Sequence, residues 1–261
     1  MTEPLILASR SDDVAVLALN RPAAMNSFTT AMHGELMAAL NAAADDRSVR
    51  CVILTGKGRG FCAGQDLSDP AAAPGQDLGA LIGAYYKPLV QRIRSMPVPV
   101  IAAVNGVAAG AGANLALCCD LVLAGASANF IQAFAKIGLV PDTGGTWLLP
   151  RLVGHARAMG LALLGDKLSS ADAAAMGLMW RSVADDQLMA EAQALAQKLA
   201  RMPLKALVAT RQALLAAQEG LSLDEALDME AKVQTQLGAA HDFLEGVDAF
   251  RNKRAPVFTD R

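Results

Sequence analysis

The stretch that decides the fold covers residues 98–119 and reads Val98-Pro99-Val100-Ile101-Ala102-Ala103-Val104-Asn105-Gly106-Val107-Ala108-Ala109-Gly110-Ala111-Gly112-Ala113-Asn114-Leu115-Ala116-Leu117-Cys118-Cys119. Its apolar first part predicts a buried strand that ends at Asn105, and its Ala- and Leu-rich second part predicts a helix. The stretch is uncharged and long enough to cross a bilayer on length alone. Because Asn105, Asn114 and several glycines interrupt it, we interpret it as a buried strand followed by a buried helix, with no membrane span.

The same alternation of short apolar strands and helices extends over the N-terminal half. We expect strands over 14–19, 51–55, 100–104 and 121–124, helices over 30–44, 77–95 and 110–118, and a loop of breaker residues over 68–76. Such alternation predicts an α/β layered fold.

After about Leu168 the strand-like runs nearly vanish. Helices are predicted over 187–202, 204–218, 222–238 and 241–252, each with apolar residues at helical spacing. These apolar faces have two interpretations, simple core packing or a helical appendage for self-association. We divide the chain into a core over 1–195 and a C-terminal helical oligomerisation region over 196–261.

Composition and charge exclude several classes of protein. The net charge of -2 and the pI near 5.9 offer no basic surface for nucleic acid. The four cysteines lack metal-ligand spacing, and reduced thiols in a cytoplasmic protein account for them most simply. The acidic residues between Met1 and Asp13 argue against a secretory signal, and no histidine lies in a triad or metal spacing. We therefore expect no metal.

Two glycine-containing turns have the same design. Phe61-Cys62-Ala63-Gly64-Gln65-Asp66-Leu67 and Asn105-Gly106-Val107-Ala108-Ala109-Gly110-Ala111-Gly112 each follow a strand, and neither contains a nucleotide-binding fingerprint. Each turn taken separately is also compatible with an ordinary tight turn. Two backbone N–H groups converging from them would form an oxyanion hole, and a helix N-terminus would favour negative charge there.

Asp142 is the one acid in the glycine-rich segment Gly138-Leu139-Val140-Pro141-Asp142-Thr143-Gly144-Gly145-Thr146. A carboxylate among Gly, Pro and small polar residues can approach a ligand closely and act as a base. Asp just before a helical pattern is equally a favoured helix N-cap. The segment alone leaves both interpretations open.

Several motifs resemble, in order and spacing, the crotonase or enoyl-CoA hydratase/isomerase superfamily. They are Leu19-Asn20-Arg21-Pro22 with Met25-Asn26, the two glycine turns, Cys119-Asp120 and the Asp142 segment. The resemblance covers essentially the whole chain. It implies a spiral of ββα units followed by a helical trimerisation region, a homotrimer or dimer of trimers, and an acyl-CoA thioester as ligand. Coenzyme A is then part of the substrate, and no separate cofactor is expected.

The resemblance also implies site residues. The backbone N–H groups of Ala63 and Ala111 would form the oxyanion hole. The backbone of Ala24, Gln65, Asp66 and Leu67 would line the path of CoA. Phe250 and Lys253 match a C-terminal stretch that often reaches the CoA of a neighbouring subunit.

Two departures from the family pattern matter most. Hydratases of this family carry two glutamates that activate water, and the matching positions here are Asn114 and Phe134. Neither side chain exchanges a proton at neutral pH, which disfavours ordinary hydration. We expect both to line a dry substrate pocket that raises the pKa of Asp142. Asp142 stands where hydratases usually have glycine, and several double-bond-moving family members place their carboxylate there.

Longer runs resemble one sub-family, the ring-epoxide isomerases of phenylacetate degradation. These runs include Pro141-Asp142 with the stretch from Gly144 to Arg151, and the stretch from Ala156 to Gly165. That resemblance implies an isomerase that converts 1,2-epoxyphenylacetyl-CoA to oxepin-CoA, shifts a 3-enoyl double bond to the 2 position, or does both. The alternatives are an aliphatic enoyl- or dienoyl-CoA isomerase, a hydratase of fatty-acid oxidation, and a non-catalytic acyl-CoA-binding subunit. A partner hydratase is also conceivable.

Overall fold

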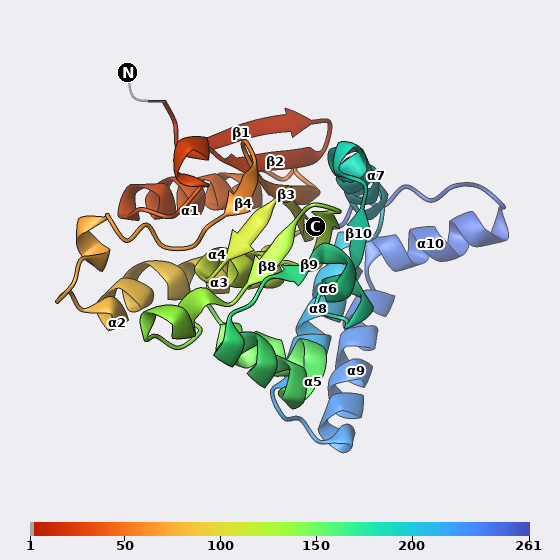
Figure 1. Ribbon diagram of the computed structural model, residues 1–261. Coiled ribbons are helices and arrows are strands. Elements are labelled where there is room, and N and C mark those ends of the chain that lie inside the picture. Colours follow the sequence, from red (N-terminus) through yellow and green to blue (C-terminus); the bar gives the residue numbers. More distant parts are fainter. Residues whose placement is uncertain (1–2) are drawn as a thin grey trace.

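The computed structural model describes residues 3–261, and the strands of these residues form two sheets (Figure 1). The larger sheet has the order β1-β2-β3-β5-β7-β10. Its strands are β1 Ile6–Ser11, β2 Val14–Leu19, β3 Cys51–Gly56, β5 Val100–Val104, β7 Leu121–Gly125 and β10 Arg181–Val183. β1 and β2 pair antiparallel, and all other neighbours in this sheet pair parallel.

The smaller sheet has the order β4-β6-β8-β9. Its strands are β4 Gly60–Cys62, β6 Val107–Ala109, β8 Asn129–Ile131 and β9 Leu168–Ser169. The first three pair parallel, and β9 pairs antiparallel with β8.

The chain alternates between the two sheets and adds a helical segment after each pair of strands. β3 and β4 precede a helical run, β5 and β6 precede α4, and β7 and β8 precede η4 and α5. The helical segments are α2 Leu78–Leu81, η3 Ile82–Tyr86, α3 Lys87–Arg94, α4 Ala111–Leu117, η4 Ala133–Ile137 and α5 Gly145–Leu164. This repeat confirms the predicted spiral of ββα units.

The core lies on both faces of the larger sheet, which explains why its strands are apolar throughout. Cys51 and Ile53 of β3 face α7 Leu188–Ala200, which covers one side with a row of small and apolar residues. Val52 and Leu54 face the other side, where α1 Thr30–Asp45, α3, α4 and the smaller sheet pack. The strands predicted over 51–55 and 100–104 are confirmed, with ends that agree within one residue.

The C-terminal helices carry large exposed apolar side chains. They are α8 Leu204–Gln218, α9 Leu223–Gly238 and α10 His241–Arg251, and Figure 1 shows α9 and α10 extending away from the sheets. Leu223, Leu227, Phe243, Leu244 and Phe250 are all more than half exposed. The predicted boundary at 195/196 falls inside α7, which packs on the sheet up to Ala200, so a division after Ala200 fits the packing better.

The remaining elements are shorter or precede the C-terminal helices. They are α6 Ser170–Ala175, η1 Pro22–Ala24, η2 Pro70–Ala72 and η5 Asp185–Gln187. No helix within residues 3–261 is long and apolar enough to cross a membrane.

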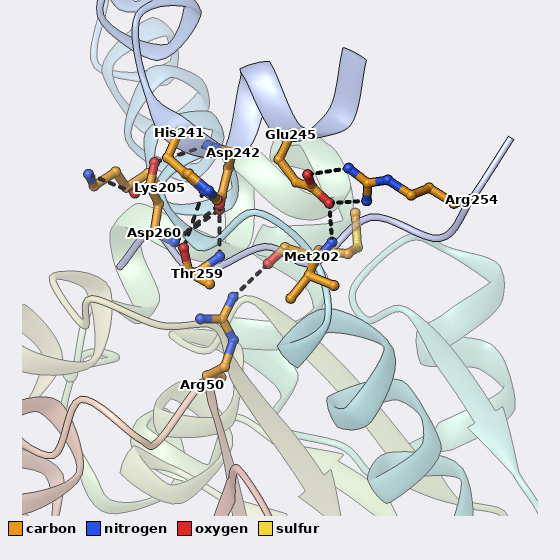
Figure 2. A network of polar contacts seen from close by, with 10 residues as sticks. Arg50, Met202, Lys205, His241, Asp242, Glu245, Arg254, Thr259 and Asp260 are labelled. Carbon is orange, nitrogen blue, oxygen red and sulfur yellow. Dashed lines mark hydrogen bonds and ion pairs between the residues drawn. The ribbon is translucent and has the colours of Figure 1, made fainter. Parts of the chain in front are cut away.

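The last residues of the chain return along α10 and are held there by polar contacts (Figure 2). Asp242 accepts hydrogen bonds from the backbone N–H groups of Thr259 and Asp260, at 2.8 and 3.2 Å. His241, Asp242 and Asp260 thereby bring three potential metal ligands together. Because the carboxylate of Asp242 already bonds backbone N–H groups and that of Asp260 lies 3.5 Å from the Lys205 ammonium, this cluster is explained as an anchor for the tail.

The structure differs from the sequence expectations mainly in short elements. The predicted helix over 77–95 spans Leu78 to Arg94, but five of its residues, Ile82–Tyr86, adopt a π-helical conformation. β1 was not predicted because most of it is exposed and polar, and β4, β6 and β8 were not predicted because each has only three residues.

Candidate active site

The first glycine turn is built around Gly64, which has φ +95° and therefore favours glycine. The N–H of Ala63 donates a hydrogen bond to the carbonyl of Met25 at 2.9 Å. That N–H is therefore occupied within the protein, and the expectation that Ala63 supplies an oxyanion donor is corrected.

The N–H of Gln65, two residues further along the turn, is not occupied in this way. The residues on either side of it bridge to Phe28: the N–H of Phe28 donates to the carbonyl of Gly64, and the N–H of Asp66 donates to the carbonyl of Phe28, at 2.7 and 2.9 Å. In such a parallel bridge the N–H of the middle residue points to the opposite side. Among residues 3–261 the N–H of Gln65 has no hydrogen-bond partner.

The second turn packs directly against the first. A Cβ on Gly112 would lie 2.3 Å from the carbonyl oxygen of Cys62, so only glycine allows α4 to begin this close. A Cβ on Gly64 would lie 3.5 Å from the backbone nitrogen of Ala111. The N–H of Ala111 also has no partner within the described part of the chain. The two turns thus place two unbonded N–H groups, those of Gln65 and Ala111, on adjacent backbone segments.

The Asn20-Arg21-Pro22 and Met25-Asn26 motifs hold the first turn in place. Asn26 is fully buried with φ +57°, and its side chain donates to the carbonyls of Lys57 and Gly60. Arg21 pairs with Asp66 at 2.8 Å. Hydrogen bonds from Ser68, together with the Arg21 guanidinium, lower the pKa of Asp66 to about 2. Asp66 is therefore ionised at neutral pH and has a structural contact that sequence reasoning missed.

Asp142 lies half-buried in the turn between η4 and α5. Its carboxylate accepts a hydrogen bond from the Thr143 hydroxyl at 2.8 Å. Burial raises the pKa of Asp142 above its ordinary value, and the Thr143 contact only partly opposes that shift. The N-cap of α5 is Gly144, with no side-chain cap. The helix-cap interpretation of Asp142 is therefore wrong, because Thr143 and Gly144 with positive φ separate Asp142 from the helix.

Asn114 holds the backbone of Asp142. Its Nδ2 donates to the Asp142 carbonyl at 2.8 Å, and its Oδ1 accepts from Nε2 of Gln132 at 2.8 Å. Asn114 is fully buried. Both ends of its amide are thus used inside the protein, and the role predicted for Asn114 in binding substrate stays a prediction.

Replacing Gly145 by Ala is expected to break this contact. A Cβ at Gly145 would lie 2.3 Å from Nδ2 of Asn114, which is too deeply buried to move away freely. Overpacking of this kind lowers the free energy of unfolding by about 1–3 kcal/mol, which chemical denaturation measures. Gly160→Ala, in the part of α5 beyond the kink at Gly154, is the control, since a Cβ there meets nothing within 4 Å and should be neutral or stabilising. A Gly145→Ala protein as stable as wild type would contradict the contact.

Phe134 and Tyr86 close the region around these groups. A Cβ on Gly110 would lie 3.7 Å from Cζ of Phe134, so the Phe134 ring faces the second turn. Tyr86 is buried and donates to Oε1 of Gln65 at 2.8 Å. Burial is the main cause that raises the pKa of Tyr86, and the charges of Cys62 and Asp142 contribute less. Tyr86 therefore contacts Gln65 directly and lies within the electrostatic influence of Asp142.

The other predicted residues divide into two groups. Ala24 lies next to Met25 in η1, and Leu67 follows Asp66 and is largely exposed, so both are close to the first turn. Phe250 lies in the last turn of α10 and is 85 % exposed, and Lys253 follows the end of that helix. Within residues 3–261 no hydrogen bond or ion pair connects either to the turns or to Asp142, so their contact with CoA stays a prediction.

This chain is similar to known proteins over nearly its whole length. The family described as enoyl-CoA hydratase/isomerase matches residues 9–261. The chain is 49% identical to the 1,2-epoxyphenylacetyl-CoA isomerase of Escherichia coli K12, over 98% of both chains. It is 51% identical to a protein of Rhodobacter capsulatus named "probable enoyl-CoA hydratase", over 96% of both chains. It also superposes on a crystal structure of an enoyl-CoA hydratase from Mycobacterium smegmatis with a TM-score of 0.90, at 34% identity over 98% of this chain and 99% of that one.

The identity with these relatives extends over nearly the whole chain, as does the family match. The chain belongs to the enoyl-CoA hydratase/isomerase family.

Proposed function

We propose that this enzyme is an acyl-CoA isomerase in which Asp142 moves a proton between two carbons of the acyl group. The carboxylate of Asp142 removes a proton from the α carbon, and the electron pair shifts onto the thioester oxygen to form an enolate. The N–H groups of Gln65 and Ala111 stabilise that oxygen. Asp142 then returns the proton at the γ carbon, which moves a 3-enoyl double bond to the 2 position.

The observation that carries the proposal is a carboxylate of raised pKa in a turn that Asn114 holds to α4, the helix whose first residue, Ala111, has an unbonded N–H. A raised pKa suits a group that takes a proton and gives it back. Hydration requires a second group that exchanges protons. Asn114 is committed to Asp142 and Gln132, and Phe134 is a hydrocarbon, so neither supports a hydratase.

For the acyl group we propose an aromatic-derived ring epoxide, a 3-enoyl chain, or both. The name of the Escherichia coli relative supports the first. The polarised thioester and the base would promote opening of an epoxide C–O bond as they promote the double-bond shift. An aliphatic 3-enoyl- or dienoyl-CoA isomerase would use the same residues in the same way.

A panel of CoA thioesters tests the proposal. The purified protein is incubated with 3-hexenoyl-CoA, crotonyl-CoA and 1,2-epoxyphenylacetyl-CoA in deuterium oxide, and the products are identified by mass. We expect isomers of unchanged mass apart from deuterium, and no product heavier by one water. Hydrated crotonyl-CoA as the main product would support the hydratase. Binding of all three without deuterium incorporation would support a silent acyl-CoA-binding subunit.

We also propose that the exposed apolar residues of α8, α9 and α10 are covered in a trimer or a dimer of trimers. In such an assembly Phe250 and Lys253 of one subunit reach the CoA of another, which accounts for their position at and just after the end of α10. A cytoplasmic location and a partner hydratase stay predictions.

A further inference from the structure

We propose that Tyr86 is a positioning residue that fixes the direction of the Gln65 N–H by holding the Gln65 side chain. This role rests on the proposed function, because it acts on the same oxyanion donor. Two independent attachments of Gln65 support it, one through the backbone and one through the side chain.

The backbone attachment joins the peptide groups on both sides of Gln65 to Phe28, at 2.7 and 2.9 Å. It fixes the plane of the turn but leaves the Gln65 N–H itself unbonded within the described residues. A donor without a partner of its own depends on neighbouring contacts for its direction. Preorganised direction is what gives an oxyanion donor its effect on rate.

The side-chain attachment supplies a second constraint. Oε1 of Gln65 accepts from the Tyr86 hydroxyl at 2.8 Å, and Nε2 donates to the carbonyl of Asp66 at 3.2 Å. The Gln65 side chain therefore connects Tyr86 to the carbonyl of the next residue, Asp66. Loss of the hydroxyl would release one end of this connection.

Tyr86 is itself held rigidly. Its ring packs edge-on against Phe28 and His33, with centroids 6.1 and 4.3 Å away. Phe28 and His33 stack on each other at 4.5 Å, and burial lowers the pKa of His33 to about 4, so this wall is uncharged at neutral pH. Phe28 thus contacts Gln65 through its backbone and Tyr86 through its ring.

The π-helical segment Ile82–Tyr86 explains how Tyr86 reaches Gln65. A π-helical turn inserts one extra residue and changes which side chains face inward, and such turns often occur at functional sites. Tyr86 is 1 % exposed, whereas its neighbour Tyr85 is only partly buried and its hydroxyl has no hydrogen bond within residues 3–261. Tyr85 is therefore a matched control for loss of a tyrosine hydroxyl in the same segment.

The test compares Tyr86→Phe with Tyr85→Phe. We expect Tyr86→Phe to lower kcat for 3-hexenoyl-CoA isomerisation by about tenfold, less than the roughly 100- to 1,000-fold for complete loss of an oxyanion donor. KM should stay within about twofold, because no CoA contact is removed. Tyr85→Phe should match wild type in both constants, and thermal melting establishes that each variant is folded.

A spectroscopic readout separates positioning from a general structural effect. The thioester carbonyl band of ¹³C-labelled phenylacetyl-CoA and hexanoyl-CoA is recorded by isotope-edited infrared difference spectroscopy, free and bound. Binding to the wild-type protein should shift the carbonyl band of the tighter-binding thioester to lower frequency. Binding to Tyr86→Phe should give a smaller shift. Gln65→Leu should reverse as much of the frequency shift as Tyr86→Phe does. The double variant should reverse no more of the shift than either single variant.

Two results would overturn the inference in different ways. If wild type polarises the carbonyl and turns over substrate while Tyr86→Phe behaves identically, Tyr86 has no positioning role but the proposed function stands. If wild type shows neither a shifted band nor turnover, the proposed function fails and the positioning role fails with it.

Discussion

Replacing Asp142 by Asn is expected to reduce isomerisation of 3-hexenoyl-CoA by about 100- to 10,000-fold, the usual contribution of general acid–base catalysis. The amide preserves the size of the side chain and can still accept from the Thr143 hydroxyl, but it cannot take a proton. The measurement is kcat, with loss of α-deuterium exchange as a second readout. Turnover near the wild-type value would remove Asp142 from the mechanism.

The same substitution should change the pH dependence and the stability in defined directions. Since burial raises the pKa of Asp142 and only the ionised form acts as a base, wild-type activity should fall as the pH falls through that raised pKa. A folded-state pKa above the unfolded value means that the charged form destabilises the folded protein at higher pH, and the effect vanishes below both pKa values. Asp142→Asn should therefore be at least as stable as wild type at neutral pH. A less stable variant at neutral pH would contradict the burial argument.

Replacing Ala111 by Pro is expected to lower kcat by about 100- to 1,000-fold, because it deletes one oxyanion donor. Ala111 is the first residue of α4, a position at which helices accept proline, and its N–H has no partner within residues 3–261. Gly110, with φ 53° and ψ -127°, precedes it in a conformation that glycine adopts readily. Steady-state kinetics and circular dichroism distinguish a catalytic loss from misfolding.

Ala111→Gly serves as the control for this experiment. It also changes the side chain at 111 but keeps the N–H, so its kcat should stay close to that of wild type. A folded Ala111→Pro enzyme with wild-type kcat would show that this N–H does not touch the reacting oxygen.

The longer elements of the fold could be predicted from the sequence because burial on both faces leaves a continuous apolar run. Cys51 to Leu54 is an example, since alternate residues face α7 and the opposite layer. The second sheet could not be predicted in this way. Its strands β4, β6 and β8 have three residues each, too few for a period of two to stand out.

The site was predictable in its residue types but not in its bonding. Asp142 stands out as the one acid of its segment, and the two turns mark where backbone donors lie. Which backbone N–H is free depends on Met25, in a distant segment of the chain. The carbonyl of Met25 accepts the hydrogen bond of the Ala63 N–H. The contact from Asn114 to Asp142 likewise depends on Gln132 and on the missing Cβ of Gly145.

The amide of Asn114 limits which side chains position 114 accepts. A glutamate at position 114 would carry no hydrogen for the Asp142 carbonyl at neutral pH, and two acceptors would face each other. Asn114→Glu would therefore remove the bond between α4 and the segment that carries Asp142. An amide at position 114, in place of a carboxylate, is thus what holds the turn that carries Asp142 to α4.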